Sequence, residues 1–103
     1  MQQFDVFANP SRRSNARAPY LLVLPSRHFL GRRTTVIAPL VNKQLLTLVE
    51  RLNPVFNIGD SAVVLSPLEL VNIPTSELRT LVTNLEYERR SIIGALDMLF
   101  TGI

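Results

Sequence analysis

The segment LEYERRSIIGALDMLFTGI, residues 85–103, has the clearest secondary-structure pattern in the chain. Its apolar residues recur at helical spacing, while most charged residues fall elsewhere around the helical wheel. Just before it, Thr83 and Glu86 have the spacing of a capping box, which would begin the helix there. We therefore expect an amphipathic C-terminal helix that packs its apolar stripe against the rest of the chain. That stripe consists of Leu85, Ile92, Leu96, Leu99 and Ile103.

The end of this helix has two interpretations. Gly102 lacks a Cβ atom and can take the left-handed conformation that closes a helix, with Ile103 then resting on Met98 in the last turn. Alternatively, the tip is held out for a partner. The first interpretation predicts a structural role for the last residues and the second a recognition role.

Upstream of the helix, the sequence predicts short β-strands separated by turns. FDVFA (4–8) and TTVIA (34–38) are rich in aromatic and β-branched residues, and the second should end before Pro39. YLLVL (20–24) is continuously apolar, which favours a strand buried on both faces. We expect these three strands to form an antiparallel meander.

The middle of the chain contains further signals of β-structure. Gly59-Asp60 lies between VFNI and AVVL, which indicates a hairpin with a tight turn. SPLEL (66–70) predicts one short helical turn, and VNIP (71–74) a brief edge strand. Residues 42–54 either form a helix or are irregular. The expected fold class is mainly β with a C-terminal α-helix (α+β), a small antiparallel β-barrel formed by one domain, residues 1–103.

Composition excludes several classes of protein. The 103 residues include no cysteine and one histidine, His28, so disulfides are excluded and a conventional metal site is not expected. Neither a secretory signal nor a membrane-spanning run is visible, and we expect a cytoplasmic protein that does not contact the membrane. Motifs for cofactors and for catalysis are also missing, so we expect no cofactor and no enzymatic activity.

Charge is distributed unevenly along the chain. Residues 1–51 hold eight basic and two acidic residues, a balance of +6, whereas residues 52–103 have a balance of −3. A basic half can indicate a nucleic acid or an acidic partner. Most of these charges lie in turn-rich segments, SRRSNAR and GRR, where solvated loops usually carry them. An exposed His28 is the simpler interpretation, although a metal-free ribonuclease needs only an acid, a base and an arginine.

Five segments resemble the CcdB family of toxins. QFDVFANP, VIAPL, PVFNIGD, VNIP and the ending IIGALDMLFTGI occur in the order and near the spacing found in that family. The resemblance implies a homodimer of SH3-like barrels, each with a C-terminal helix. It also implies a toxin that binds the gyrase A subunit and traps gyrase on cleaved DNA, without being an enzyme itself.

The same resemblance implies a gyrase-binding surface made of the helix end, the first strand and the loop after the second strand. By position, these residues are Thr101, Gly102, Ile103, Asp97, Gln3, Phe4, Phe7, Ser26, His28 and Phe29. Ordinary core or rim packing is the alternative role for the three phenylalanines. A plasmid-encoded member has tryptophan in place of Thr101, and threonine cannot stack on a partner's guanidinium group.

A CcdA-type antitoxin is the second implied partner. It is expected to wrap the toxin with a disordered segment that folds on binding, so that DNA is reached only indirectly, through the antitoxin complex. Two alternatives remain open: a ribonuclease toxin on the same fold, and a homologue that binds antitoxin without poisoning gyrase.

Overall fold

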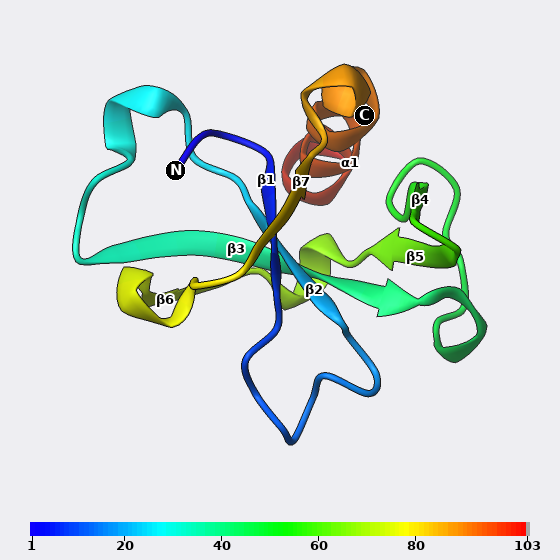
Figure 1. The fold of residues 1–103 in the computed structure, drawn as a ribbon. Helices are drawn as coiled ribbons and strands as arrows, with labels where there is room; N and C mark the ends of the chain where they lie inside the picture. Colours follow the sequence, from blue (N-terminus) through cyan, green and yellow to red (C-terminus); the bar gives the residue numbers. More distant parts are fainter. Residues whose placement is uncertain (103) are drawn as a thin grey trace.

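The chain forms a strongly bent antiparallel sheet with one helix packed against it, in a computed structural model that describes residues 1–102 (Figure 1). The helix, α1, spans Arg89–Thr101. This confirms the predicted fold class, a mainly antiparallel β-structure of barrel type with a C-terminal helix. The strands are β1 (Asp5–Ala8), β2 (Tyr20–Val23), β3 (Thr34–Asn42), β4 (Val55–Ile58), β5 (Ser61–Leu65), β6 (Val71–Pro74) and β7 (Leu81–Asn84). Short 3-10 turns are η1 (Arg27–Phe29), η2 (Lys43–Leu45), η3 (Pro67–Glu69), η4 (Thr75–Glu77) and η5 (Glu86–Glu88).

β3 organises the sheet. The meander β1–β2–β3 is confirmed, with Val6 opposite Leu22 and Leu22 opposite Ala38. The other edge of β3 is shared, since residues 34–37 pair with β6 and residues 40–42 pair with β5. The β4–β5 hairpin is also confirmed, and Gly59 at its turn has a positive φ of 59°. The turn at η3 and the strand β6 match the sequence prediction as well.

The prediction that the third strand ends before Pro39 is wrong. β3 continues to Asn42, and Pro39 lies opposite Leu21 in the register. Pro39 sits where the partner of β3 changes from β6 to β5, and its carbonyl accepts a hydrogen bond from the Ser66 amide at 3.1 Å. A missing amide hydrogen is tolerated there because no regular ladder bond is required of it.

Residues 42–54 are irregular beyond η2, so the helical alternative is wrong. Leu45, Leu48 and Val49 are exposed, and Leu52 alone of the apolar residues in that proposed helical pattern is buried. Asn53 fixes the segment through its side chain, which accepts from the Val49 amide and donates to the Leu65 carbonyl. Local apolar spacing did not make a helix because no apolar surface within residues 1–102 covers Leu45, Leu48 and Val49.

The helix also begins later than the capping box predicts. Thr83 belongs to β7 and pairs with Val6 of β1, so it does not cap a helix. The side-chain oxygen of Asn84 instead accepts a hydrogen bond from the Glu86 amide at 2.7 Å, just before η5 and α1. β7 was missed because its Leu81 and Val82 are exposed on an edge strand.

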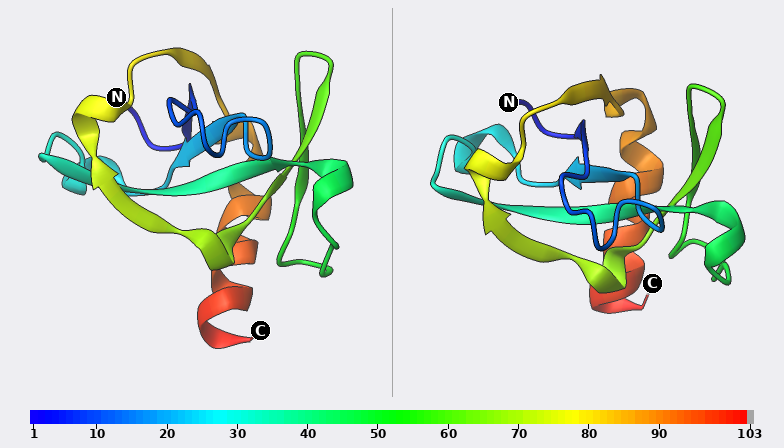
Figure 2. Two further views of the ribbon diagram at one scale, coloured as in Figure 1. Left: turned by 90° about the horizontal axis from the view of Figure 1, so that it is seen from below. Right: turned by 60° about the horizontal axis from the view of Figure 1, so that its bottom comes forward.

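Two apolar clusters occupy opposite faces of the strands. The larger one lies under α1, and the helix contributes Ile92 and Ala95, both fully buried, to it. The smaller one contains five buried residues. Figure 2 shows the red end of α1 projecting past the sheet. The members of the smaller cluster are Phe7, Leu21, Val23, Ile37 and Leu78.

Candidate functional site

Most of the exposed residues predicted to bind gyrase lie near one end or the other of α1. Gln3, Ser26 and His28 line a concavity of about 570 Å³ beside Arg89, the first residue of the helix. Phe29 lines a separate, more apolar concavity of about 450 Å³ with Phe100 from the last turn. At 1.5 Å per residue, the two ends lie roughly 16 Å apart. These predicted residues therefore line two separate concavities.

The turn η1 joins these two sites. His28 faces the first concavity and its neighbour Phe29 the second. The turn is closed by a hydrogen bond from the Phe29 amide to the Ser26 carbonyl at 2.9 Å. The rings of His28 and Phe29 lie edge to face, with centroids 6.5 Å apart. Two adjacent residues of one short turn thus line the concavities at the two ends of α1.

Arg89 bonds to several residues at the N-terminal end of α1, which we call the polar end. Its guanidinium group makes two hydrogen bonds to Glu86, at 2.8 and 3.0 Å, and one to the Gln3 side chain at 2.9 Å. It also lies over the Phe4 ring, 4.9 Å from the centroid. The hydrogen bonds to Glu86 raise the pKa of Arg89. Gln3 donates in turn to the carbonyl of Leu24, the residue that follows β2, at 3.0 Å, which ties the start of the chain to the end of that strand.

The apolar end presents two large exposed rings. Phe29 is 59% exposed and Phe100 is 69% exposed, although both line the same concavity. Leu96 lines it as well and also packs against the larger apolar cluster. Exposed aromatic side chains beside a hollow are typical of residues that anchor a partner.

The helix tip has the predicted closure. Gly102 adopts the left-handed conformation, with φ of 73°, and its amide donates to the Met98 carbonyl at 3.1 Å. Thr101 donates its hydroxyl to the Asp97 carbonyl at 2.7 Å. Thr101, Asp97 and Gly102 are exposed. Ile103, which the sequence analysis assigned to the same tip, lies outside the described residues.

Phe4 and Phe7 are buried. Phe4 is completely inaccessible and belongs to the larger cluster, while Phe7 is 7% exposed and belongs to the smaller one. Their burial matches the alternative interpretation, in which these phenylalanines pack in the core and do not contact a partner. Phe4 also has a positive φ of 68°, uncommon for a bulky residue. Its amide and carbonyl bond to Val23 and Leu85, which holds this conformation in place.

The sequence analysis did not single out Arg89 and Phe100, which line the two concavities. Phe100 was visible as an apolar residue beside the stripe, and its position off the stripe could have indicated exposure. No local signal identifies Arg89, because its role depends on Gln3 and Phe4, which are distant in sequence.

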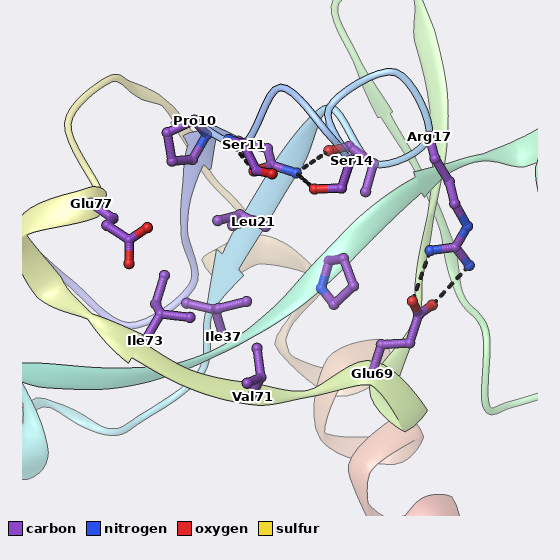
Figure 3. Close-up of a pocket in the computed structure, with 13 residues that line it drawn as sticks. Pro10, Ser11, Ser14, Arg17, Leu21, Ile37, Glu69, Val71, Ile73 and Glu77 are labelled. Atoms are coloured by element: carbon purple, nitrogen blue, oxygen red, sulfur yellow. Dashed lines mark hydrogen bonds and ion pairs between the residues drawn. The ribbon is translucent and has the colours of Figure 1, made fainter.

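A third concavity, of about 260 Å³, contains none of the predicted site residues (Figure 3). Its apolar wall includes Leu21 and Ile37, and Glu77 lies at its rim. An ion pair crosses another part of the rim, where Arg17 holds Glu69 with hydrogen bonds of 2.7 and 3.0 Å. These bonds, with help from Ser66, lower the pKa of Glu69.

Among residues 1–102, no group of histidine, cysteine, aspartate or glutamate side chains could hold a metal ion. The described part of the chain also has no helix long and apolar enough to cross a membrane.

Comparison with known proteins places the chain in a family. No curated protein matches it. The sequence model of the family described as CcdB protein, in contrast, matches residues 3–102 of the 103-residue chain. With nearly the whole sequence matched and the expected barrel and C-terminal helix present, the chain belongs to the CcdB family, whose members are toxins of toxin–antitoxin modules.

Proposed function

We propose that this protein acts as a homodimer that binds the gyrase A subunit and traps gyrase on cleaved DNA, so that replication is blocked. The observation that carries the proposal is the family match over residues 3–102. The tip of α1 supports it, because the helix end projects past the sheet (Figure 2) and Asp97, Thr101 and Gly102 are exposed.

The chemistry of the tip favours a cationic partner. A helix C-terminus carries partial negative charge on its last carbonyl groups. Asp97 adds a full negative charge one turn before the end, and the helix has no basic residue in its last turn. An arginine of the partner would therefore be attracted to this tip.

Phe29 and Phe100 are proposed as apolar anchors beside the tip. Because Thr101 offers no aromatic surface for an arginine to stack on, the exposed rings take over part of that role. Gln3, Ser26 and His28 would form a second, polar contact at the other end of α1. One target surface would then have to reach both ends of the helix.

The proposed antitoxin partner is a CcdA-type protein. A disordered segment of it would fold on this toxin, release gyrase and bring the complex to operator DNA through its own DNA-binding domain. The positive balance of residues 1–51 is compatible with an acidic peptide as that segment.

Supercoiled plasmid incubated with gyrase and this protein tests the proposal. Linear DNA should accumulate when the reaction is stopped with detergent. Under the same conditions without gyrase, an RNA substrate should stay intact, since metal-independent cleavage would favour the ribonuclease alternative. Growth arrest on expression without antitoxin should accompany poisoning. A chain that causes no arrest and no linear DNA would be a homologue without toxin activity.

The role of the tip is tested separately with two matched charge changes, one on α1 and one in η5 just before it. Asp97→Asn should weaken binding to a gyrase A fragment about threefold to tenfold, whereas Glu88→Gln, at the residue that precedes α1, should change it less. Deleting residues 102–103 should weaken binding by about 2 kcal/mol or more while the protein stays folded. Calorimetry gives the affinities, and thermal melting checks the fold. Normal melting with parental affinity after the deletion would contradict a recognition role.

Thr101→Trp supplies the missing stacking surface. We expect tighter binding to a gyrase fragment that offers an arginine at this place. Unchanged affinity would indicate that the arginine is elsewhere or that Phe29 and Phe100 already meet it.

A further inference from the structure

Three arginine side chains on one short segment have no internal partner. The segment is RHFLGRR, residues 27–33, between β2 and β3, and its arginines are Arg27, Arg32 and Arg33. All three are exposed, and their guanidinium groups make no hydrogen bond or ion pair with any residue in the described range 1–102. Arg17 and Arg89, in contrast, are each held by a glutamate.

The backbone that carries these arginines is fixed. Thr75 of η4 donates its amide to the Arg33 carbonyl at 2.8 Å and its hydroxyl to the Arg32 carbonyl at 2.7 Å. Gly31, with φ of 80°, makes the turn between η1 and these residues. The arginines therefore extend from a defined scaffold, and less ordering is needed when a ligand binds.

The local field is positive because compensating carboxylates are scarce. The sequence contains no acidic residue between Asp5 and Glu50. In space, Glu77 lies on the same 3-10 turn as Thr75, and Glu86, which lines the concavity beside Arg27, is already bonded to Arg89. Three free guanidinium groups thus exceed the nearby free negative charge.

We propose that Arg27, Arg32 and Arg33 bind the phosphate backbone of duplex DNA directly and without base recognition. Guanidinium groups match phosphate oxygens in geometry and charge, and contacts of this kind are independent of sequence. This goes beyond the proposed function, in which DNA is reached only through the antitoxin.

DNA is favoured over an acidic peptide by the strand pairing around the segment. Peptides often bind by adding a strand to a free sheet edge. Here residues 34–37 of β3 are paired with β6 on one edge. On the other edge β2 pairs from Ile37 and the Leu24 amide donates to the Val36 carbonyl, which leaves a free edge of only two residues, Thr34 and Thr35. A protruding turn beside paired strands suits the exposed phosphates of a duplex, which need no strand edge.

Two double variants with the same change in charge test the proposal. Arg32→Gln/Arg33→Gln removes the proposed contacts, and Arg12→Gln/Arg13→Gln removes two exposed arginines from the other basic loop. Binding of a fluorescent duplex of mixed sequence is measured by anisotropy at two salt concentrations. We expect the first pair to weaken binding about tenfold or more and to reduce the slope of log affinity against log salt by about 1 to 2. The second pair should weaken it less than threefold.

Three results would overturn the proposal: a parent protein that does not bind the duplex at low salt, equal weakening by both double variants, or a glutamate-rich peptide that binds as tightly and depends on the same arginines. Circular dichroism checks folding. Should the glutamine pair fail to fold, Arg32→Ala and Arg33→Ala are measured singly, and each should lower the salt slope by about 1. Arg33→Gln alone, at a residue that lines neither concavity beside α1, should leave the affinity for a DNA-free gyrase A fragment parental, which separates this inference from the proposed function.

Discussion

The two faces of the sheet are built from adjacent residues of the same strands, yet they end in different environments. Leu22 and Leu21 are neighbours on β2, and their side chains point to opposite faces because strand side chains alternate. Leu22 belongs to the larger cluster under α1 and is fully buried. Leu21 belongs to the smaller cluster and lines the concavity rimmed by Arg17 and Glu69.

This difference shows what the C-terminal helix contributes. On its face, α1 closes the apolar surface with Ile92 and Ala95, which leaves no accessible area on either. On the opposite face, the Arg17–Glu69 ion pair joins the long loop after β1 to the turn η3, and a hollow of about 260 Å³ stays open. One face is specified by apolar packing and the other partly by surface hydrogen bonds.

The largest effect on the free energy of unfolding is expected when a leucine on each face of the sheet is replaced by alanine and the two costs are compared. Leu22→Ala should lower the free energy of unfolding by about 4 kcal/mol, because it leaves a cavity in a closed cluster. Leu21→Ala should cost about 2 kcal/mol, since its site already borders an open hollow. Urea denaturation of both variants measures the difference. Equal costs would show that the open face is as tightly packed as the closed one.

The next largest effect concerns the joint between β7 and α1. Asn84 donates to the Gln3 carbonyl at 3.0 Å and to the Asp5 carboxylate at 2.9 Å. Asp5 is only 5% exposed, so Asn84→Ala leaves a buried acceptor with fewer donors. We expect a loss of about 2 kcal/mol. Asn57→Ala on the exposed side of β4 is the control and should be nearly neutral.

Leu96→Ala tests how far along α1 the tightly packed face extends. Leu96 packs against the larger cluster but is only partly buried, and the last turns of α1 extend past the sheet (Figure 2). We expect a cost of about 1 kcal/mol, below the usual range for a core leucine. A loss of 3 kcal/mol or more in chemical denaturation would mean that a further surface covers this side chain in solution.

The smallest effect is expected on the open face, from Glu69→Gln. The hydrogen bonds from Arg17 lower the pKa of Glu69 in the folded protein, so the stabilisation is present above the unfolded pKa, about 4.3, and is lost as the pH falls through the folded value. Both side chains are substantially exposed, which limits the effect to below about 1 kcal/mol. The variant should therefore differ from the parent at pH 7 and converge with it towards pH 3. A difference that is unchanged at pH 3 would rule out ionisation of Glu69 as its source.

Local signals in the sequence predicted most of the elements. The hairpin at Gly59, the turn at η3 and the closure at Gly102 each depend on residues close in sequence, so their patterns could be recognised directly. The predictions that were wrong involve long-range pairing. Thr83 has a capping-box partner three residues later, but β1 offers it a strand edge, and the strand pairing decides the outcome.

The candidate site was predicted as a set of residues, while its arrangement was not. The ordered segments of a known family indicated Gln3, His28 and Phe29 as contact residues, and these are at the surface or near it. That His28 and Phe29 serve opposite ends of α1 could not be predicted, because it depends on how the turn η1 lies across the helix.

The sequence by itself determined the family, the fold class and the local turns that short-range chemistry controls, such as those at Gly59 and Gly102. Proline, glycine and β-branched residues act on the backbone within a few positions, so no knowledge of distant contacts is needed. Only the tertiary structure decided that Phe4 and Phe7 are core residues, that residues 81–84 form a strand, and that Arg27, Arg32 and Arg33 have no acidic partner in the described chain. Burial and charge pairing depend on which distant segments come together, and that is set by the packing of the whole sheet against α1.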